Sequence, residues 1–173
     1  MSLLALAASA ISSFEIRRMP VPELAAAVLP FARTRYADRL EITTFERAVA
    51  LAQERATTLV QIAQQAEFLF VDDDALAIDE ESWKKLVATE RASELLDAVI
   101  DFVAHCEWSE QIDVRPLITE LGLKVRKVMH VLYTAIEGRG AGLPLFDAIA
   151  MLGREHALNR LKRARDRLEE ARS

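Results

Sequence analysis

Few side chains in this sequence are placed for catalysis. His105 and Cys106 are adjacent, and neighbouring residues of a helix point about 100° apart, so they do not form a nucleophile–base pair. The acids Asp72, Asp73 and Asp74 lack the glycine and the distal glutamate of a calcium loop, so we expect a solvated loop or a helix start there. The residues by themselves support no catalytic mechanism and predict no metal or cofactor in this chain.

The glycine-rich stretch 138–142 reads Gly-Arg-Gly-Ala-Gly. A phosphate-binding loop needs a preceding strand and a following Lys-Ser/Thr, and the sequence offers neither. Cys106 is the only cysteine, which excludes a disulfide framework. We expect a small buried hydrophobe there, in a protein of the reducing cytoplasm.

Charged residues are unevenly distributed along the 173-residue chain, whose formal net charge is −5. Residues 61–114 carry a net −11, whereas residues 115–173 carry +5. A basic carboxy-terminal third suits contact with a polyanion, but the overall acidity argues against a non-specific nucleic-acid coat protein. A solvated helix face is the alternative interpretation of the same charge run.

The elements that would position these residues are helical. Apolar residues recur at three- and four-residue spacing almost throughout, as in amphipathic helices. Thr43 with Glu46, and Thr58 with Gln61, have the spacing of capping boxes. Five glycines and five prolines are too few for the turns of a sandwich or barrel. The sequence therefore predicts an all-α fold of about eight short helices.

Several helix boundaries can be predicted from prolines, glycines and N-capping residues. Pro22 opens a helix that Pro30 kinks or ends, and Ser109 caps a helix that ends near Gly122. The clearest helices are expected at 90–106, 124–136, 145–152 and 155–171, with a loop at 138–144. The apolar stretch 1–13 lacks the basic start of a signal peptide, so we expect an N-terminal extension or cloning remnant. No apolar run approaches the ~18 residues of a membrane span.

Four stretches follow one another in the order of a known family. Residues 16–20 read Ile-Arg-Arg-Met-Pro, residues 54–59 read Glu-Arg-Ala-Thr-Thr-Leu, and Trp108 precedes an expected helix. The most specific stretch contains Leu-Pro-Leu-Phe at 143–146, Leu-Gly-Arg-Glu at 152–155 and Asn-Arg-Leu at 159–161. Together they resemble the carboxy-terminal anticodon-binding region of bacterial glutamyl-tRNA synthetase, a class I aminoacyl-tRNA synthetase, from about residue 14 to 167.

The resemblance implies an all-α helix cage of two consecutive subdomains, 14–77 and 78–173, that grips the anticodon stem-loop of tRNA(Glu). In this family a separate domain with His-x-Gly-His-type and Lys-Met-Ser-Lys-Ser-type signatures binds ATP and Mg²⁺ and aminoacylates the tRNA. Neither signature occurs here. The resemblance thus implies the tRNA-reading part of a glutamate–tRNA ligase, inactive alone, that works with a catalytic domain in cis. A cytoplasmic monomer without membrane contact is expected.

Individual positions match residues that read bases in the family. Arg55 matches an arginine that reads the third anticodon base, and its planar guanidinium suits that contact. Tyr133 replaces an arginine that contacts the first base. A tyrosine ring can stack on a base but lacks the paired N–H donors of a guanidinium. Gly142 replaces the usual Thr or Ser at the middle base. Leu145, which would wedge against the splayed bases, is retained.

Further basic residues are expected to contact the RNA, namely Lys124, Arg126, Lys127, Arg139 and Arg154. The alternative for Arg55 is an exposed helix arginine paired with Glu46 or with a neighbour of Glu54. The departures at Tyr133 and Gly142 leave a second hypothesis open: a stand-alone helical interaction module of the same fold that has lost standard anticodon reading. Binding to tRNA(Glu), measured across salt concentrations, separates the two.

Overall fold

The computed structural model describes residues 11–173, and every regular element within them is helical. The all-α prediction is confirmed. The chain divides at Val71/Asp72 into two compact units, while the boundary expected from the sequence was 77/78. The expected N-terminal extension lies mostly outside the described residues, and its end already belongs to the fold because Ser12 caps the first described helix. Among the described residues, no helix combines the length and apolar character that crossing a membrane requires.

The first unit is built around its longest helix, α3, which packs against α4 and α5. Its core includes Tyr36, whose ring stacks on Phe70 with centroids 5.0 Å apart, and Phe45, whose ring is tilted against Phe70. The hydroxyl of Tyr36 donates to the Ala63 carbonyl at 3.0 Å. The elements are α2 (Ser13–Arg18), α3 (Val21–Tyr36), η1 (Ala37–Arg39), α4 (Ile42–Gln53), α5 (Leu59–Ala66) and η2 (Glu67–Phe70).

Two expected boundaries in this unit are corrected. Helix α3 does not end at Pro30 but continues through it to Tyr36. Helix α4 is capped by Glu41 instead of Thr43, because the Glu41 carboxylate accepts from the amides of Thr43 at 2.9 Å and Thr44 at 2.7 Å. The Thr44 hydroxyl also donates to this carboxylate at 2.6 Å, and this bond, followed by the two amide bonds, lowers the pKa of Glu41 to about 2.

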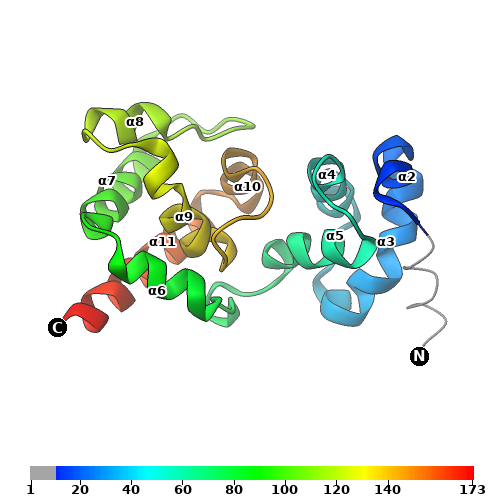
Figure 1. Ribbon diagram of the computed structural model, residues 1–173, viewed down its shortest axis with the longest axis horizontal. Coiled ribbons are helices and arrows are strands. Elements are labelled where there is room, and N and C mark those ends of the chain that lie inside the picture. The colour runs from blue at the N-terminus through cyan, green and yellow to red at the C-terminus, as the bar shows by residue number, and fades with distance from the viewer. Residues whose placement is uncertain (1–10) are drawn as a thin grey trace. The chain divides into compact units, whose positions relative to one another are not determined.

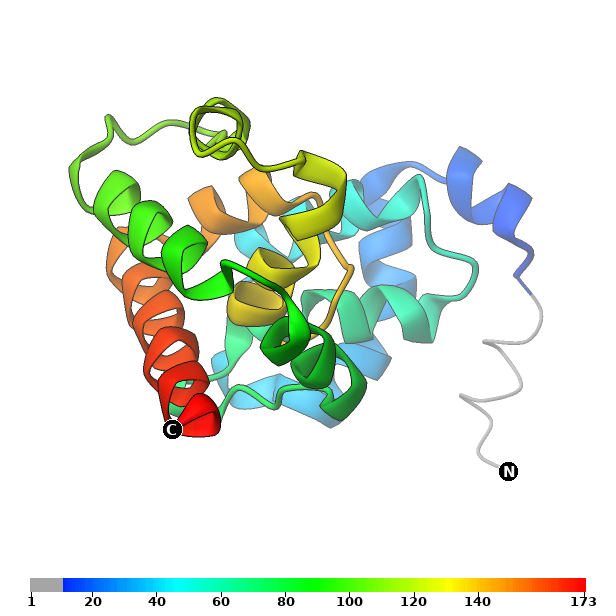
Figure 2. The same cartoon turned by 60° about the vertical axis from the view of Figure 1, so that its left-hand side comes forward.

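The second unit is organised by α11, which lies along α7 and also packs on α9, α10 and η3. Figures 1 and 2 show α11 beside α7 from two directions. The elements are η3 (Asp73–Ala75), α6 (Glu80–Ala88), α7 (Ala92–His105), α8 (Arg115–Glu120), α9 (Val125–Glu137), α10 (Leu145–Leu152) and α11 (Arg154–Arg172). The four predicted helices and the 138–144 loop therefore exist, within two residues of the expected ends.

Two expectations about this unit, on Ser109 and on Cys106, are wrong in detail. Ser109 does not cap α8; the Asp113 carboxylate accepts from the Arg115 amide at 2.9 Å instead. Helix α7 begins after Arg91, whose positive φ of 62° interrupts the helical path. Cys106 is half-buried at the end of α7 and is not a core hydrophobe.

Candidate nucleic-acid interface

Arg55 stands on a rigid turn between α4 and α5. Its amide donates to the Ala52 carbonyl at 3.1 Å, and the next residue, Ala56, is fully buried. On the far side, the amide of Thr57 donates to the Gln61 side chain at 2.8 Å, which holds the start of α5. Arg55 itself is exposed, and the described residues give it no side-chain hydrogen bond or ion pair, so the pairing with Glu46 or a neighbour of Glu54 is not formed. The turn presents a guanidinium to solvent.

Three cations gather at the first turn of α9. Lys124, Arg126 and Lys127 are exposed and line a surface hollow together with Val125. Within the described part of the chain none of the three is ion-paired, the first turn holds no acid, and no side chain caps the helix. A helix N-terminus already carries partial positive charge, so three cations there repel the helix dipole as well as one another. An anion bound at this end would relieve both repulsions.

Tyr133 lies on the same helix as this cluster. It follows Arg126 by seven residues, which places the two side chains on one face of α9, and it is half-buried. His130, on the same stripe, shares a 2.9 Å hydrogen bond with the Thr89 hydroxyl. Tyr133 is therefore part of a packed helix face whose amino-terminal end carries the unpaired cations.

The glycine-rich loop after α9 is pinned to the start of α6. The Gly138 carbonyl accepts from the Asp79 amide at 2.7 Å, and the Gly140 amide donates to the Ser82 hydroxyl at 2.9 Å. A Cβ atom on Gly138 would collide with the Ala77 carbonyl oxygen, and its φ is +80°. The loop is thus fixed in shape by its glycines and by α6. Arg139, one of the predicted RNA contacts, is half-buried in this loop.

Glu137 is an almost fully buried acid in this region, and the sequence analysis did not single it out. Only 3% of it is exposed, its Oε2 accepts from the Leu143 amide at 3.0 Å, and its Oε1 has no hydrogen-bond partner among the described residues. Burial raises the pKa of Glu137 to about 8, against the opposing effect of the Leu143 hydrogen bond and of Arg139 and Arg160. An acid directly before a three-glycine loop was the only signal that the sequence offered.

Two predicted contacts have other roles in this structure. Leu145 is only 2% exposed and packs in the core, so it would have to leave the core to wedge against a base. The Arg154 guanidinium donates to the Val103, Ala104 and Cys106 carbonyls at 3.2, 2.7 and 2.7 Å. It also lies over the Trp108 ring, 5.2 Å from the centroid. Arg154 therefore caps α7, and its guanidinium N–H groups are used by hydrogen bonds within the protein.

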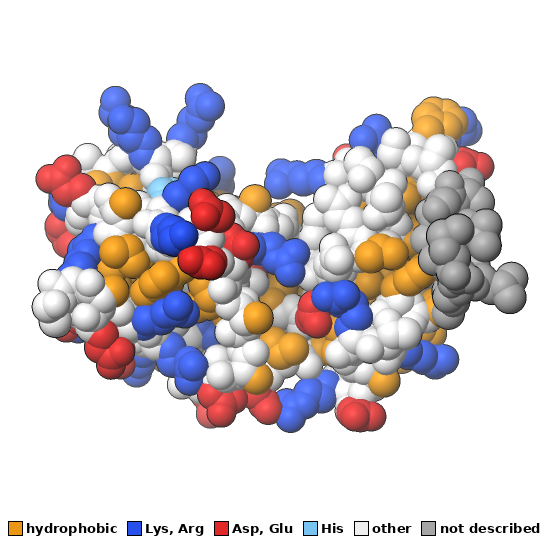
Figure 3. Space-filling view, turned by 60° about the horizontal axis from the view of Figure 1, so that its bottom comes forward, with side chains coloured by type: hydrophobic (Ala, Val, Ile, Leu, Met, Phe, Trp, Pro, Cys, Tyr) orange, Lys and Arg blue, Asp and Glu red, His pale blue; other side chains and the backbone are white. Residues whose placement is uncertain are grey.

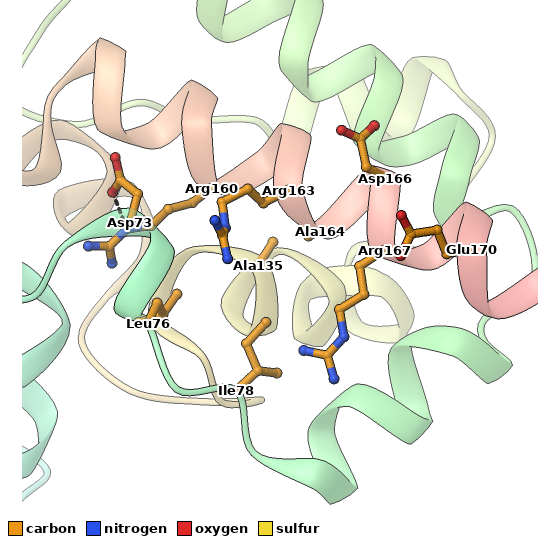
Figure 4. Close-up of a pocket in the computed structure, with 10 residues that line it drawn as sticks. All are labelled: Asp73, Leu76, Ile78, Ala135, Arg160, Arg163, Ala164, Asp166, Arg167 and Glu170. Carbon is orange, nitrogen blue, oxygen red and sulfur yellow. Dashed lines mark hydrogen bonds and ion pairs between the residues drawn. The ribbon is translucent and has the colours of Figure 1, made fainter.

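A groove of about 230 Å³ runs beside α11 (Figure 4). Asp73 lies at one end, where its carboxylate accepts from Arg160 Nε at 2.8 Å, from His156 Nδ1 at 2.8 Å and from Asn159 at 3.1 Å. Burial alone raises the pKa of Asp73, but these donors outweigh it and hold the pKa below its usual value. Asp73 is thus the first residue of η3 and an anchor for α11, so of the two expected roles, a solvated loop or a helix start, the structure has the helix start.

The groove does not indicate a polyanion site, because three arginines and three acids line it. On the face shown in Figure 3, basic and acidic side chains are also interspersed. The start of α9 and the Arg55 turn are two places on the described residues where exposed cations have no ion pair.

Comparison with known proteins identifies the family of this all-α chain. The sequence matches the family described as "Anticodon binding domain" over residues 23–165. The chain belongs to this family, and its resemblance to the carboxy-terminal anticodon-binding region of bacterial glutamyl-tRNA synthetases is confirmed.

The similar curated proteins are glutamate–tRNA ligases. That of Salinispora arenicola is 37% identical over 165 residues, covering 88% of this chain and 34% of the relative; that of Frankia alni is 35% identical, covering 88% and 33%. The chain thus spans about a third of the length of these relatives. A crystal structure of a glutamate–tRNA ligase from Elizabethkingia meningosepticum has the same fold, with a TM-score of 0.70 and 21% identity over 91% of this chain and 31% of that one.

Proposed function

We propose that this chain binds the anticodon stem-loop of tRNA(Glu) as part of a glutamate–tRNA ligase. The observation that carries the proposal is the cluster of three unpaired cations at the uncapped start of α9, in a domain of the anticodon-binding family. A catalytic domain in cis would bind ATP and Mg²⁺ and aminoacylate the tRNA. By itself the chain is proposed to be inactive, monomeric and cytoplasmic.

The two cationic sites suit different parts of such a ligand. Phosphate contacts supply affinity without sequence information, and the start of α9 offers lysines and a helix N-terminus without a side-chain cap for them. Base contacts supply specificity, and a lone guanidinium on a rigid turn is suited to a base edge. We therefore assign the α9 cluster to the RNA backbone and Arg55 to an unpaired base. Tyr133 and Arg139 remain further proposed contacts, whereas we leave Arg154 and Leu145 out of the proposed interface.

Lys127→Ala is expected to weaken binding of every tRNA alike. Removal of one phosphate contact should reduce the slope of log affinity against log salt by roughly one. The matched control is Lys84→Ala, since Lys84 is an exposed lysine that already pairs with Glu80 at 3.0 Å. Filter binding from low to physiological salt measures both slopes. Equal slopes for the two variants would remove the α9 cluster from the interface.

Arg55→Ala is expected to flatten the preference for the third anticodon base, the one that the matching arginine reads in the family. One bidentate arginine contact contributes about 1–3 kcal/mol of discrimination in duplex DNA, and we expect a similar effect here. Arg55→Lys keeps the charge but not the planar fork, so it should lose the discrimination and retain most of the affinity. Arg33→Ala, at another exposed arginine of the same unit, is the control. Binding is measured on transcripts that differ at one anticodon position.

The interaction module remains the second candidate, because the side chains expected at positions 133 and 142 for base reading are replaced. If the wild-type chain binds tRNA(Glu) no better than an unrelated tRNA, and Arg55→Ala leaves tRNA affinity and base preference unchanged, the interaction module replaces the tRNA-binding function as the proposal.

A further inference from the structure

We propose that Glu137 is a specificity-determining residue of the RNA site: its buried carboxyl group replaces the missing side chain of Gly142 and hydrogen-bonds one unpaired base of the anticodon loop. This inference rests on the proposed tRNA-binding function. It concerns a residue that neither the motif comparison nor the surface charge singled out.

The first support is the space around Gly142. The backbone of Gly142 does not have a positive φ, so no left-handed conformation requires a glycine at this position. A Cβ atom at this position would nevertheless collide with Glu137 Oε2, and the nearest heavy atoms around it all belong to the Glu137 carboxyl group. The carboxyl group therefore occupies the volume that a side chain of residue 142 would fill. A polar group is present at this point of the loop, although it is supplied by α9.

The second support is the incomplete hydrogen bonding of this carboxyl group. Oε2 is engaged by the Leu143 amide, whereas Oε1 is buried without a partner among the described residues. Buried polar atoms are paired in the great majority of cases, so an unpaired one calls for an explanation. The charged side chains that act on the group are Arg139 in the loop and Arg160 on α11, and Arg160 already donates to Asp73 and to the Ile136 carbonyl. Oε1 therefore has an unused hydrogen-bonding position that a ligand atom could take once the carboxyl group is uncovered.

The protonation state defines which ligand atom fits. Because burial raises the pKa of Glu137 to about 8, the group is mostly a neutral acid at pH 7. Its carbonyl oxygen accepts from Leu143, and its hydroxyl at Oε1 can donate. The partner is then an acceptor on a base, either a carbonyl oxygen or a ring nitrogen. Gly142 lies directly against the carboxyl group, and residues 140–142 carry a single side chain, that of exposed Ala141. Access to Oε1 therefore requires this segment to move and the hydrogen bond between the Gly140 amide and the Ser82 hydroxyl to open.

Two substitutions at position 137 separate recognition from packing. Glu137→Gln keeps the acceptor for Leu143 and a donor at the free position, so it should bind tRNA(Glu) within about twofold of the wild type. Glu137→Met fills the same space without a donor and should bind about tenfold more weakly, a typical effect of one hydrogen bond. The loss should be confined to transcripts with the native base at one anticodon position. Binding of the full chain is measured on transcripts altered at each position, with circular dichroism to confirm folding.

A double variant makes the test independent of the stability of Glu137→Met. Glu137→Ala with Gly142→Thr moves the hydrogen-bonding group from residue 137 to residue 142, and it should restore the base preference that Glu137→Ala alone loses. If Glu137→Met weakens all transcripts equally, or weakens none, the inference is wrong while tRNA binding stands. If the wild-type chain shows no preference for tRNA(Glu), both the inference and the proposed function fail.

Discussion

Asp73→Ala is expected to lower the free energy of unfolding by about 3 kcal/mol. The Arg160 side chain is 1% exposed, and Asp73 is the carboxylate that neutralises it, at 2.8 Å and with 12% exposure. Removal of one partner of a buried ion pair leaves an uncompensated charge in the interior and typically costs about 3–5 kcal/mol. The partial exposure of Asp73 places the expected value at the lower end. His156 and Asn159 lose their acceptor at the same time.

The neighbouring acid provides the control for this prediction. Asp74 belongs to the same acidic run but is exposed, so Asp74→Ala should change stability by no more than about 0.5 kcal/mol. Urea denaturation followed by circular dichroism measures both variants against the wild type. Comparable effects at the two positions would show that Asp73 is a surface charge and not the anchor of η3 on α11.

Local sequence patterns predicted the helices well where an apolar stripe was continuous. Helix α10 has the predicted ends because a proline precedes it and Gly153, at a φ of +87°, ends it. Helix α6 was missed because its sequence, EESWKKLVA, is mostly polar and buries only Leu86 fully, so it has no long apolar stripe. Its N-cap, Asp79, was visible but not interpreted. Tertiary contacts to α9 and α11 stabilise α6, and a local pattern does not contain them.

The site was predicted less completely, for a physical reason. A sequence indicates that an arginine is present but not which atoms its guanidinium contacts. Arg55 and Arg154 were both assigned to RNA, yet Arg55 is exposed while Arg154 donates to carbonyls about 50 residues away along the chain. The pairing of Asp73 with Arg160 spans 87 residues. The relation between Glu137 and Gly142 depends on how a loop folds back, which spacing alone does not reveal.

The stability of the protein is expected to fall as pH rises from about 4.5 to about 8, through Glu137. The unfolded chain releases this proton near the ordinary pKa of 4.5, whereas the folded protein holds it to about 8. Within this window the native state binds more protons than the unfolded state, so the free energy of unfolding decreases with pH. One pKa unit corresponds to about 1.4 kcal/mol, so the rise from 4.5 to about 8 corresponds to a total of about 5 kcal/mol. The stabilisation is fully present below the lower pKa and is lost as pH rises through the upper one.

Glu137→Gln removes this proton linkage while it keeps the acceptor for the Leu143 amide. The variant should therefore lack the decline, and its advantage over the wild type should grow steadily between pH 5 and pH 8.5. Glu120→Gln, at an exposed glutamate of α8, is the control and should follow the wild-type curve. Urea denaturation at each pH measures all three proteins. Parallel curves for wild type and Glu137→Gln would mean that the carboxyl group ionises freely, and a buried neutral acid under the glycine loop would then be excluded.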